Sequence, residues 1–349
     1  MAQSQTSKSQ NTKPAASKRS HRRADAKPQV AAVVGMGLMG TSIAACLLGA
    51  GHQLACVEAD PAKLRSAPRR LRELLLDSWE RGLIAVSPDE LMARVTISGD
   101  FSVLKNAAII VESTVENIEV KRQVISDIEA AVSPRALIGS NTSAIPVTQL
   151  QLGARHPERI LGLHWAEPAN ITRFMEIICG KSTSLSNAQK VMRLARGWGK
   201  EPSLLRRDIR GFITNRIMYA MLREAFYLVE SGYATIADVD RSMRNDLGYW
   251  ITFAGPFRFM DLTGIPAYAA VMKDLFPDLD CSTKVPRLMQ QVARSGGRGV
   301  ANAKGFYRYT PAQAKRWEKL FLEFSHDIRD LAGKYPEDIG DRTATAKRK

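Results

Sequence analysis

The chain has 349 residues, of which 45% are hydrophobic, and it carries a formal net charge of +15 at pH 7. This length favours two domains, and the apolar fraction is enough to build a core for each. No stretch approaches the roughly 18 consecutive apolar residues that a membrane-spanning helix needs, so we expect no membrane span.

Most of the positive charge lies at the two ends. Residues 1–28 carry seven Lys and Arg against one acid, and residues 341–349 carry four against one. Because the body of the chain is only weakly basic, we expect no nucleic-acid partner. We expect a disordered basic tail over 1–28 and a flexible basic tail over 334–349. A transit peptide or a polyanion-binding arm is the alternative for the first tail.

The four cysteines lie far apart, without the CxxC or CxxH spacing of a metal or redox site. They are Cys46, Cys56, Cys179 and Cys281. Three of them lie in apolar runs, which is typical of buried free thiols. We therefore expect a reducing, cytoplasmic compartment and no metal site.

In chain order, the first ordered segment is an apolar run from Val30 to Val34 that ends at Gly35, which suits a buried parallel strand. A helix over 38–49 and a second strand over 53–57 complete a βαβ unit. A charged amphipathic segment follows over 61–82, with further strands expected at 95–97, 108–111, 136–140 and 160–164 and near Glu176, and a helix at 186–199. This alternation predicts an α/β, Rossmann-like doubly wound sheet over 29–207.

From Gly211 onward the apolar residues have helical spacing. The segment from Phe212 to Val229 shows it most clearly, with the pattern of a buried helix. We therefore predict a second, all-helical domain over 208–333.

The first motif with chemical content is Gly35-Met36-Gly37-Leu38-Met39-Gly40, between a predicted strand and a predicted helix. Its glycines allow a tight turn, and the backbone N–H groups at the helix N-terminus can bind a pyrophosphate. Glu58 ends the next strand, where a carboxylate can accept hydrogen bonds from ribose hydroxyls. The same charge would repel a 2′-phosphate, so the pattern favours NAD over NADP.

The second candidate is a pair of residues twelve positions apart. His164 ends a predicted strand, and the carboxyl ends of parallel strands face the ligand crevice. Glu176 is an acid inside an otherwise apolar strand, which is costly unless the carboxylate is paired. Glu176 could hold the imidazole in one tautomer while His164 accepts a substrate proton. A histidine that is merely hydrogen bonded at a strand end is the alternative.

A third cluster of polar side chains contains Ser143 at a strand exit and Asn215 at the start of the second domain. Such side chains can donate hydrogen bonds to a carbonyl oxygen in the crevice. They can equally cap a helix, and the sequence leaves both interpretations open.

Eight motifs occur together and in a recognisable order. They are GMGLMGTSIA, VESTVENIEVK, SNTSAIP, GLHWAEP, MEI, GFITNRI, AGPF and GFYRY. In this combination the chain resembles the 3-hydroxyacyl-CoA dehydrogenase family over about residues 30 to 310. The resemblance implies NAD as cofactor, a helical domain that mediates homodimerisation, and oxidation of a 3-hydroxyacyl-CoA to a 3-oxoacyl-CoA, as in fatty-acid or hydroxybutyryl-CoA metabolism.

The resemblance also implies roles for particular residues. The family's histidine matched by His164 takes the hydroxyl proton, and the acid matched by Glu176 lies behind it. Ser143 and Asn215 match polar groups near the substrate oxygens.

Further matches concern the cofactor and coenzyme A. Glu116 and Lys121 match residues that contact the cofactor. Arg81 falls where the family often has a lysine for coenzyme A phosphates, although an ordinary helix charge is the alternative.

The sequence departs from the family at points that concern the substrate. Glu167, in His-Trp-Ala-Glu-Pro, replaces the asparagine of His-Phe-Phe-Asn-Pro, so a hydrogen-bond donor becomes a carboxylate. That charge disfavours a developing oxyanion and favours a cationic, carnitine-like substrate, unless Glu167 forms a salt bridge with an arginine such as Arg173. Leu74 stands where the family often has a serine directed towards coenzyme A.

Three hypotheses follow. The first is hydride transfer between NAD and an acyl-CoA-type substrate. The second is a dehydrogenase of the same fold that acts on a 3-hydroxy compound without coenzyme A. The third is an NAD-binding regulatory protein without turnover, which the retention of both His164 and Glu176 disfavours.

Overall fold

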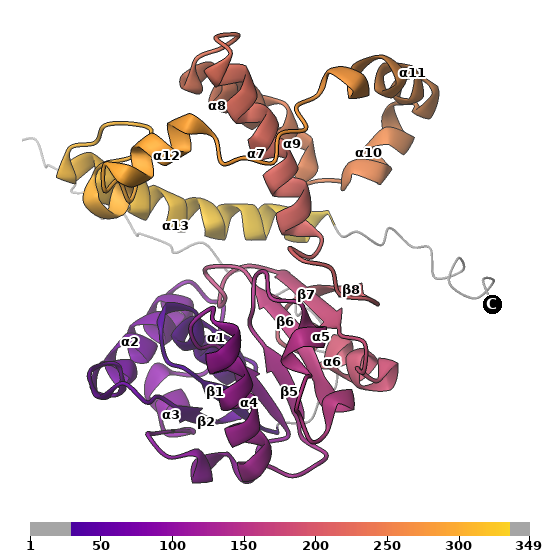
Figure 1. Cartoon of the computed structure of the whole chain (residues 1–349). Coiled ribbons are helices and arrows are strands. Elements are labelled where there is room, and N and C mark those ends of the chain that lie inside the picture. Colours follow the sequence, from indigo (N-terminus) through magenta and orange to yellow (C-terminus); the bar gives the residue numbers. More distant parts are fainter. Residues whose placement is uncertain (1–28, 336–349) are drawn as a thin grey trace, which may run out of the picture.

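The structure is a computed structural model in which residues 29–335 are described. The tail expected over 1–28 and residues 336–349 of the second tail lie outside the described residues. Figure 1 shows a sheet domain below, a layer of helices above, and one long helix, α13, running between them. No helix within 29–335 is long and apolar enough to cross a membrane.

Within the described residues, eight strands form one sheet in the order β3-β2-β1-β4-β5-β6-β7-β8. The strands are β1 (Val30–Val34), β2 (Gln53–Val57), β3 (Val95–Ser98), β4 (Ile109–Glu112), β5 (Leu137–Ser140), β6 (Ile160–Trp165), β7 (Phe174–Cys179) and β8 (Glu201–Leu205). Neighbouring strands are parallel except for β6 and β7, which are antiparallel. The predicted Rossmann-like, mostly parallel sheet is confirmed.

Helices cover both faces of this sheet. They are α1 (Leu38–Gly49), α2 (Pro61–Glu80), α3 (Pro88–Met92), α4 (Ile118–Ala131), α5 (Val147–Leu150) and α6 (Leu185–Gly197), with short 3₁₀ helices at Phe101–Leu104 and Pro157–Arg159. Alternate residues of β1 point to opposite faces. Ala31 and Val33 pack in the core under α1, α2 and α6, and Ala32 and Val34 pack in the core under α4 and α5.

The second domain is helical, as predicted. Its helices are α7 (Thr214–Glu230), α8 (Ile236–Asn245), α9 (Leu247–Ile251), α10 (Pro256–Thr263), α11 (Ile265–Leu275), α12 (Arg287–Arg294) and α13 (Pro311–Lys334), with short 3₁₀ helices at Phe276–Asp278 and Val300–Asn302. The expectation that the segment from Phe212 to Val229 forms a buried helix is wrong for this chain, because α7 has no buried residue. Its apolar residues, such as Ile217 at 57% exposure, line an open groove instead.

Two local features differ from the expected boundaries. The helix expected from Phe212 starts at Thr214, because Gly211 and Phe212 have φ angles of 83° and 53°, which a right-handed helix does not allow. The strand β8 was not expected. It is an edge strand that contains Pro202 and buries only Leu205, so it lacks the apolar run of a central strand.

Candidate active site

The glycine-rich turn lies between β1 and α1. Gly35 has a φ of 92°, and a Cβ atom there would lie 2.6 Å from the Ser113 carbonyl oxygen. A Cβ atom on Gly40 would lie 1.8 Å from the carbonyl oxygen of Gly35, so both positions require glycine. A Cβ atom on Gly37 would meet nothing within 4 Å. The backbone at the start of α1 is therefore open to a pyrophosphate, as an NAD site requires.

Glu58 lies at the end of β2, next to this turn. One carboxylate oxygen accepts the Met36 N–H at 2.8 Å, and the other accepts the Asp60 N–H at 2.9 Å. The structure thus holds the carboxylate beside the glycine-rich turn, in the position that suits ribose hydroxyls. Leu38, which is 72% exposed, lies at the open side of the turn, and Met39 packs partly against the core.

His164 and Glu176 form a buried pair. They are directly opposite one another in the antiparallel β6–β7 register, and His164 Nδ1 lies 2.7 Å from Glu176 Oε2. The second oxygen of Glu176 accepts the backbone N–H groups of Ile213 at 3.0 Å and Thr214 at 2.9 Å, at the start of α7. The expected partnership of the two residues is therefore present in the structure.

The surroundings of Glu176 keep its carboxyl group ionised. Burial raises the pKa of this group, but the hydrogen bonds from His164, Thr214 and Ile213 together outweigh burial and bring the pKa below its usual value. An ionised Glu176 accepts the proton on His164 Nδ1, which leaves Nε2 as the free acceptor. The rings of Phe174 and Phe212 pack against the imidazole, with centroids 5.4 and 5.6 Å away.

The polar residues expected near the substrate come together from two domains. Asn215 Nδ2 donates to the Ser143 carbonyl oxygen at 2.8 Å. Glu116 accepts the Thr142 hydroxyl at 2.6 Å and the Ser143 N–H at 3.0 Å. Burial raises the pKa of Glu116, but the Thr142 hydrogen bond, the Lys121 charge and the N–H groups of the Ser143 loop together outweigh burial, so the pKa is lowered. These contacts hold the Ser143 loop against the start of α7.

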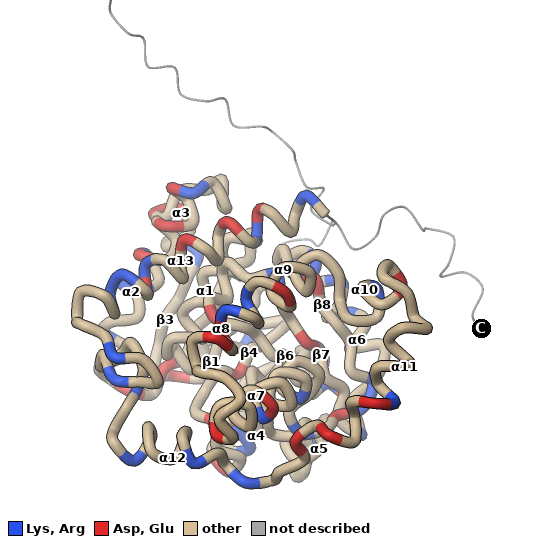
Figure 2. Tube along the Cα trace, turned by 90° about the horizontal axis from the view of Figure 1, so that it is seen from above, with Lys and Arg blue, Asp and Glu red and all other residues tan. Residues whose placement is uncertain are grey.

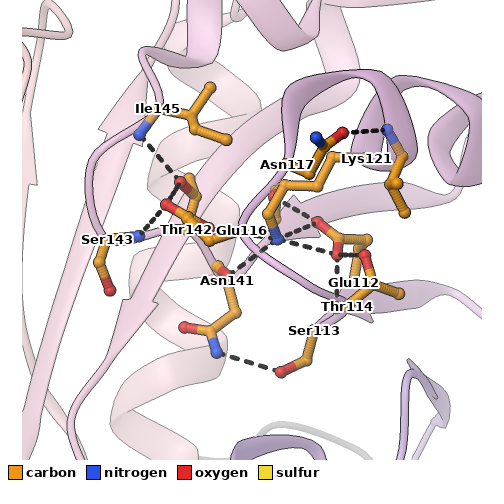
Figure 3. A network of polar contacts seen from close by, with 12 residues as sticks. Glu112, Ser113, Thr114, Glu116, Asn117, Lys121, Asn141, Thr142, Ser143 and Ile145 are labelled. Atoms are coloured by element: carbon orange, nitrogen blue, oxygen red, sulfur yellow. Dashed lines mark hydrogen bonds and ion pairs between the residues drawn. The ribbon is translucent and has the colours of Figure 1, made fainter. Parts of the chain in front are cut away.

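A buried ion pair beneath this loop was not singled out from the sequence. Lys121 and Glu112 have fully buried side chains, and Lys121 Nζ lies 3.0 Å from both oxygens of Glu112 (Figure 3). Lys121 also donates to the Asn141 carbonyl oxygen at 3.2 Å. Glu112 further accepts the Thr114 N–H at 2.6 Å and the Ser140 hydroxyl. An acid that ends a buried strand, with a lysine nine residues later on a helix, is the sequence signal for this pair.

Glu167 and Arg81, the other two residues expected near the substrate, lie in exposed parts of the structure. Glu167 lies in the loop after β6, directly before a cis proline. The residue as a whole is exposed, but its carboxyl group is partly buried, and this burial raises the pKa of the carboxyl group. The alternative salt bridge with Arg173 is wrong, because Arg173 pairs with Glu201. Arg81 pairs with Asp77 at 2.9 Å, and Asp77 also lies 3.4 Å from His326 of α13. No motif around His326 marks this contact in the sequence.

The lowered pKa of Glu176 predicts a pH-dependent contribution to stability. A depressed carboxyl pKa stabilises the fold above the unfolded-state value, about 4.5, and this stabilisation is lost as pH falls through the folded-state value. At neutral pH we therefore expect Glu176→Gln to lower the free energy of unfolding by about 1–3 kcal/mol, measured by urea denaturation. The difference between variant and wild type should shrink as the pH falls below about 4.5, the unfolded-state value; a difference that is constant with pH would contradict this assignment.

Comparison with known proteins places this geometry in a family. The NAD binding domain of 3-hydroxyacyl-CoA dehydrogenase matches residues 30–209, and the C-terminal domain of the same family matches residues 211–309. A 5-formyl-3-hydroxy-2-methylpyridine 4-carboxylate 5-dehydrogenase from Mesorhizobium japonicum is 31% identical over 81% of this chain and 92% of its own. A probable 3-hydroxybutyryl-CoA dehydrogenase from Bacillus subtilis is 28% identical over 79% and 96%.

Solved structures agree. The crystal structure of a 5-formyl-3-hydroxy-2-methylpyridine 4-carboxylic acid 5-dehydrogenase, described as an NAD+ dependent dismutase, has a TM-score of 0.82 at 28% identity and covers 88% of this chain and 100% of that chain. FadB2 of M. tuberculosis has a TM-score of 0.68 at 27% identity, over 81% and 99%. Together with the glycine-rich turn and Glu58, these matches make NAD the cofactor of this chain. The chain belongs to the 3-hydroxyacyl-CoA dehydrogenase family.

Proposed function

We propose that the protein is an NAD-dependent dehydrogenase of a small hydroxy compound, with His164 as its acid and base. The observation that carries the proposal is the buried His164–Glu176 pair at the carboxyl end of β6, on the same edge of the sheet as the glycine-rich turn. When bound, NAD supplies the nicotinamide that accepts a hydride from the carbon bearing the hydroxyl group.

The residues of the chain move the proton and hold the reacting groups. The hydroxyl proton passes to His164 Nε2, and the resulting imidazolium is stabilised by the ionised Glu176 at 2.7 Å. The substrate C–O bond becomes a carbonyl as the hydride and the proton leave. The Ser143 hydroxyl and the Asn215 amide are the proposed donors to the substrate oxygen. For Glu116 and Lys121 a direct cofactor contact stays a proposal, and their contacts support a role in shaping the Ser143 loop.

The first test removes the proton acceptor. We expect His164→Ala to lower kcat by about 10²- to 10⁴-fold, because general acid–base catalysis contributes that much. NADH binding, followed by fluorescence titration, should stay unchanged. His156→Ala, which removes a surface imidazole, is the matched control and should keep wild-type activity. A wild-type protein that binds NADH but reduces no 3-oxo compound would favour the non-catalytic alternative.

The substrate can be a coenzyme A thioester or a compound without coenzyme A. Several relatives named 3-hydroxybutyryl-CoA dehydrogenases support the first, and the pyridine carboxylate dehydrogenase supports the second.

The surroundings of Arg81 favour a substrate without coenzyme A. The hydrogen bond to Asp77 raises the pKa of Arg81, and the charges of Glu323 and Asp327 on α13 act in the same direction. Arg81 is thus engaged by a neighbouring acid and is less free to bind the phosphates of coenzyme A.

Two further observations support a substrate without coenzyme A. Leu74, where the family often has a serine, packs partly against the core and offers no hydrogen bond. The helix that brings the acids to Arg81, α13, lies outside the family match that ends at residue 309. The carboxyl group of Glu167 remains a candidate contact for a cationic substrate such as dehydrocarnitine.

The second test compares two thioesters that share the reacting group. We expect similar kcat/KM, within about threefold, for acetoacetyl-CoA and acetoacetyl-N-acetylcysteamine, because no favourable contact to the nucleotide part is expected. Arg81→Ala should leave both values unchanged, as should Arg69→Ala, a control on an exposed ion pair of the same helix. A tenfold or larger preference for the coenzyme A ester that Arg81→Ala abolishes would restore the acyl-CoA assignment.

We also propose that two copies of the chain associate through the helical domain. Between residues 208 and 335 only five residues are buried: Phe212, Ala254, Ala314, Ser325 and His326. A groove of about 1620 Å³ runs between α7 and α13, lined by apolar side chains such as Met221, Trp317 and Phe321. An apolar surface of this size on a domain with so small a core needs cover, and a symmetric second copy supplies it.

The buried cysteines are free and fit the proposed cytoplasmic location.

The third test measures the mass in solution. Light scattering after size exclusion should give twice the 38.5 kDa of one chain. Ile217→Glu, which places a charge in the groove, should shift the protein towards the monomer, whereas Lys190→Glu on the exposed face of α6 should not. A wild-type monomer at micromolar concentration would refute the homodimer.

A further inference from the structure

The loop over residues 166–173 joins the two strands of the catalytic pair. It leaves β6 directly after His164 and Trp165 and enters β7 two residues before Glu176. The position of the loop therefore bears on both members of the pair and on Glu167, which the loop carries. The β6–β7 register sets His164 across from Glu176, and a group that holds this loop supports that pairing at its end.

Lys200, between α6 and β8, reaches this loop from the side of the sheet. Its side chain is buried, with 3% of the residue exposed, and its Nζ donates to the Ala169 carbonyl oxygen at 2.5 Å and to that of Thr172. The ammonium also lies 5.0 Å from the centroid of the Trp165 ring. Within residues 29–335 it forms no ion pair with a carboxylate.

A buried ammonium without an acid is costly, so its contacts must offset its desolvation. Burial lowers the pKa of Lys200, as expected for such a site. The carbonyl groups of Ala169 and Thr172 and the face of the Trp165 ring offset the cost of burying this charge. The two carbonyl groups belong to the loop, and Trp165 directly follows His164. The proposed reaction itself gives Lys200 no task, because the side chain does not touch His164 or Glu176.

Other contacts hold the same loop in place. Asn170 exchanges hydrogen bonds with Ser42 of α1 and donates to Ser78 of α2 at 3.1 Å. Arg329 of α13 donates to the Ile171 carbonyl oxygen. The Trp165 ring stacks on Trp198, with centroids 5.7 Å apart and 15° between the planes. Lys200 joins the loop to the Trp165 ring, through the two loop carbonyl groups and the face of the indole.

We propose that Lys200 is a positioning residue for catalysis: its buried ammonium ties the 166–173 loop to Trp165 and so holds His164 against Glu176. The proposal rests on the proposed dehydrogenase function. Without the ammonium, the carbonyl groups of Ala169 and Thr172 are left unpaired and the loop must shift to find other donors. A shift of about 1 Å in a catalytic group is enough to lower a rate about 100-fold.

The experiment compares Lys200→Met, which keeps the length of the side chain and removes its charge, with Lys200→Arg, which keeps the charge. Lys190→Met, on the exposed face of the neighbouring helix, is the matched control. With a substrate that the wild type turns over, we expect Lys200→Met to lower kcat about 10- to 100-fold. KM and the NADH dissociation constant should stay within about threefold of wild type. Lys200→Arg should recover at least part of kcat, and Lys190→Met should match wild type.

A second readout does not depend on turnover. The ¹⁵N signals of the His164 ring report its Nδ1 hydrogen bond to Glu176, and we expect them to shift in Lys200→Met and not in Lys190→Met. Unchanged His164 signals, or a kcat within about twofold of wild type in folded Lys200→Met, would overturn the proposal. If Lys200→Met does not fold, Lys200→Gln, which keeps N–H donors without the charge, is held to the same criteria.

These readouts distinguish a failure of the proposed dehydrogenase function from a failure of the proposed role of Lys200. An inactive wild type whose His164 signals still respond to Lys200→Met refutes the dehydrogenase and leaves the positioning contact standing. An active wild type whose kcat and His164 signals ignore Lys200→Met refutes the positioning role alone.

Discussion

The structure depends on how it accommodates one carboxylate in the middle of a strand. Glu176 is 1% exposed, and a charge buried to that degree must be matched by donors on every side. The antiparallel pairing of β6 and β7 supplies the first donor, because the register sets His164 directly across from Glu176. The first N–H groups of α7 supply the others. A slip of one residue in this register would move the histidine to the opposite face of the sheet.

A second buried charge has a similar structural role at the ends of the parallel strands. Glu112 closes β4, and Lys121 on α4 lies between this carboxylate and the carbonyl group of Asn141, just after β5. Asn141 in turn accepts the N–H of Trp165 at 3.2 Å. The pair thus links the exits of three consecutive strands, β4, β5 and β6. Sites built from loops gain rigidity when groups buried below them fix the strand ends.

Local patterns were enough to predict much of this chain. The boundaries expected for α1 and β2 agree with the structure, because glycines mark both ends of α1 and the apolar run of β2 lies between Gly51 and Glu58. The pairing of His164 with Glu176 could be predicted from the cost of an unpaired acid in an apolar strand. Other features depend on contacts distant in sequence. No local pattern reveals that Lys200 meets the 166–173 loop, or that the apolar stripe of α7 lines an open groove.

The hydrogen bonds between Glu176 and the start of α7 join the two domains at the His164–Glu176 pair. Glu176 belongs to the sheet domain, and its donors Ile213 and Thr214 belong to the helical one, just past the left-handed corner at Gly211 and Phe212. A hinge rotation at that corner would pull both N–H groups away and leave the carboxylate short of donors. The arrangement of Glu176 that the proposed proton transfer needs therefore depends on the two domains staying together at this corner.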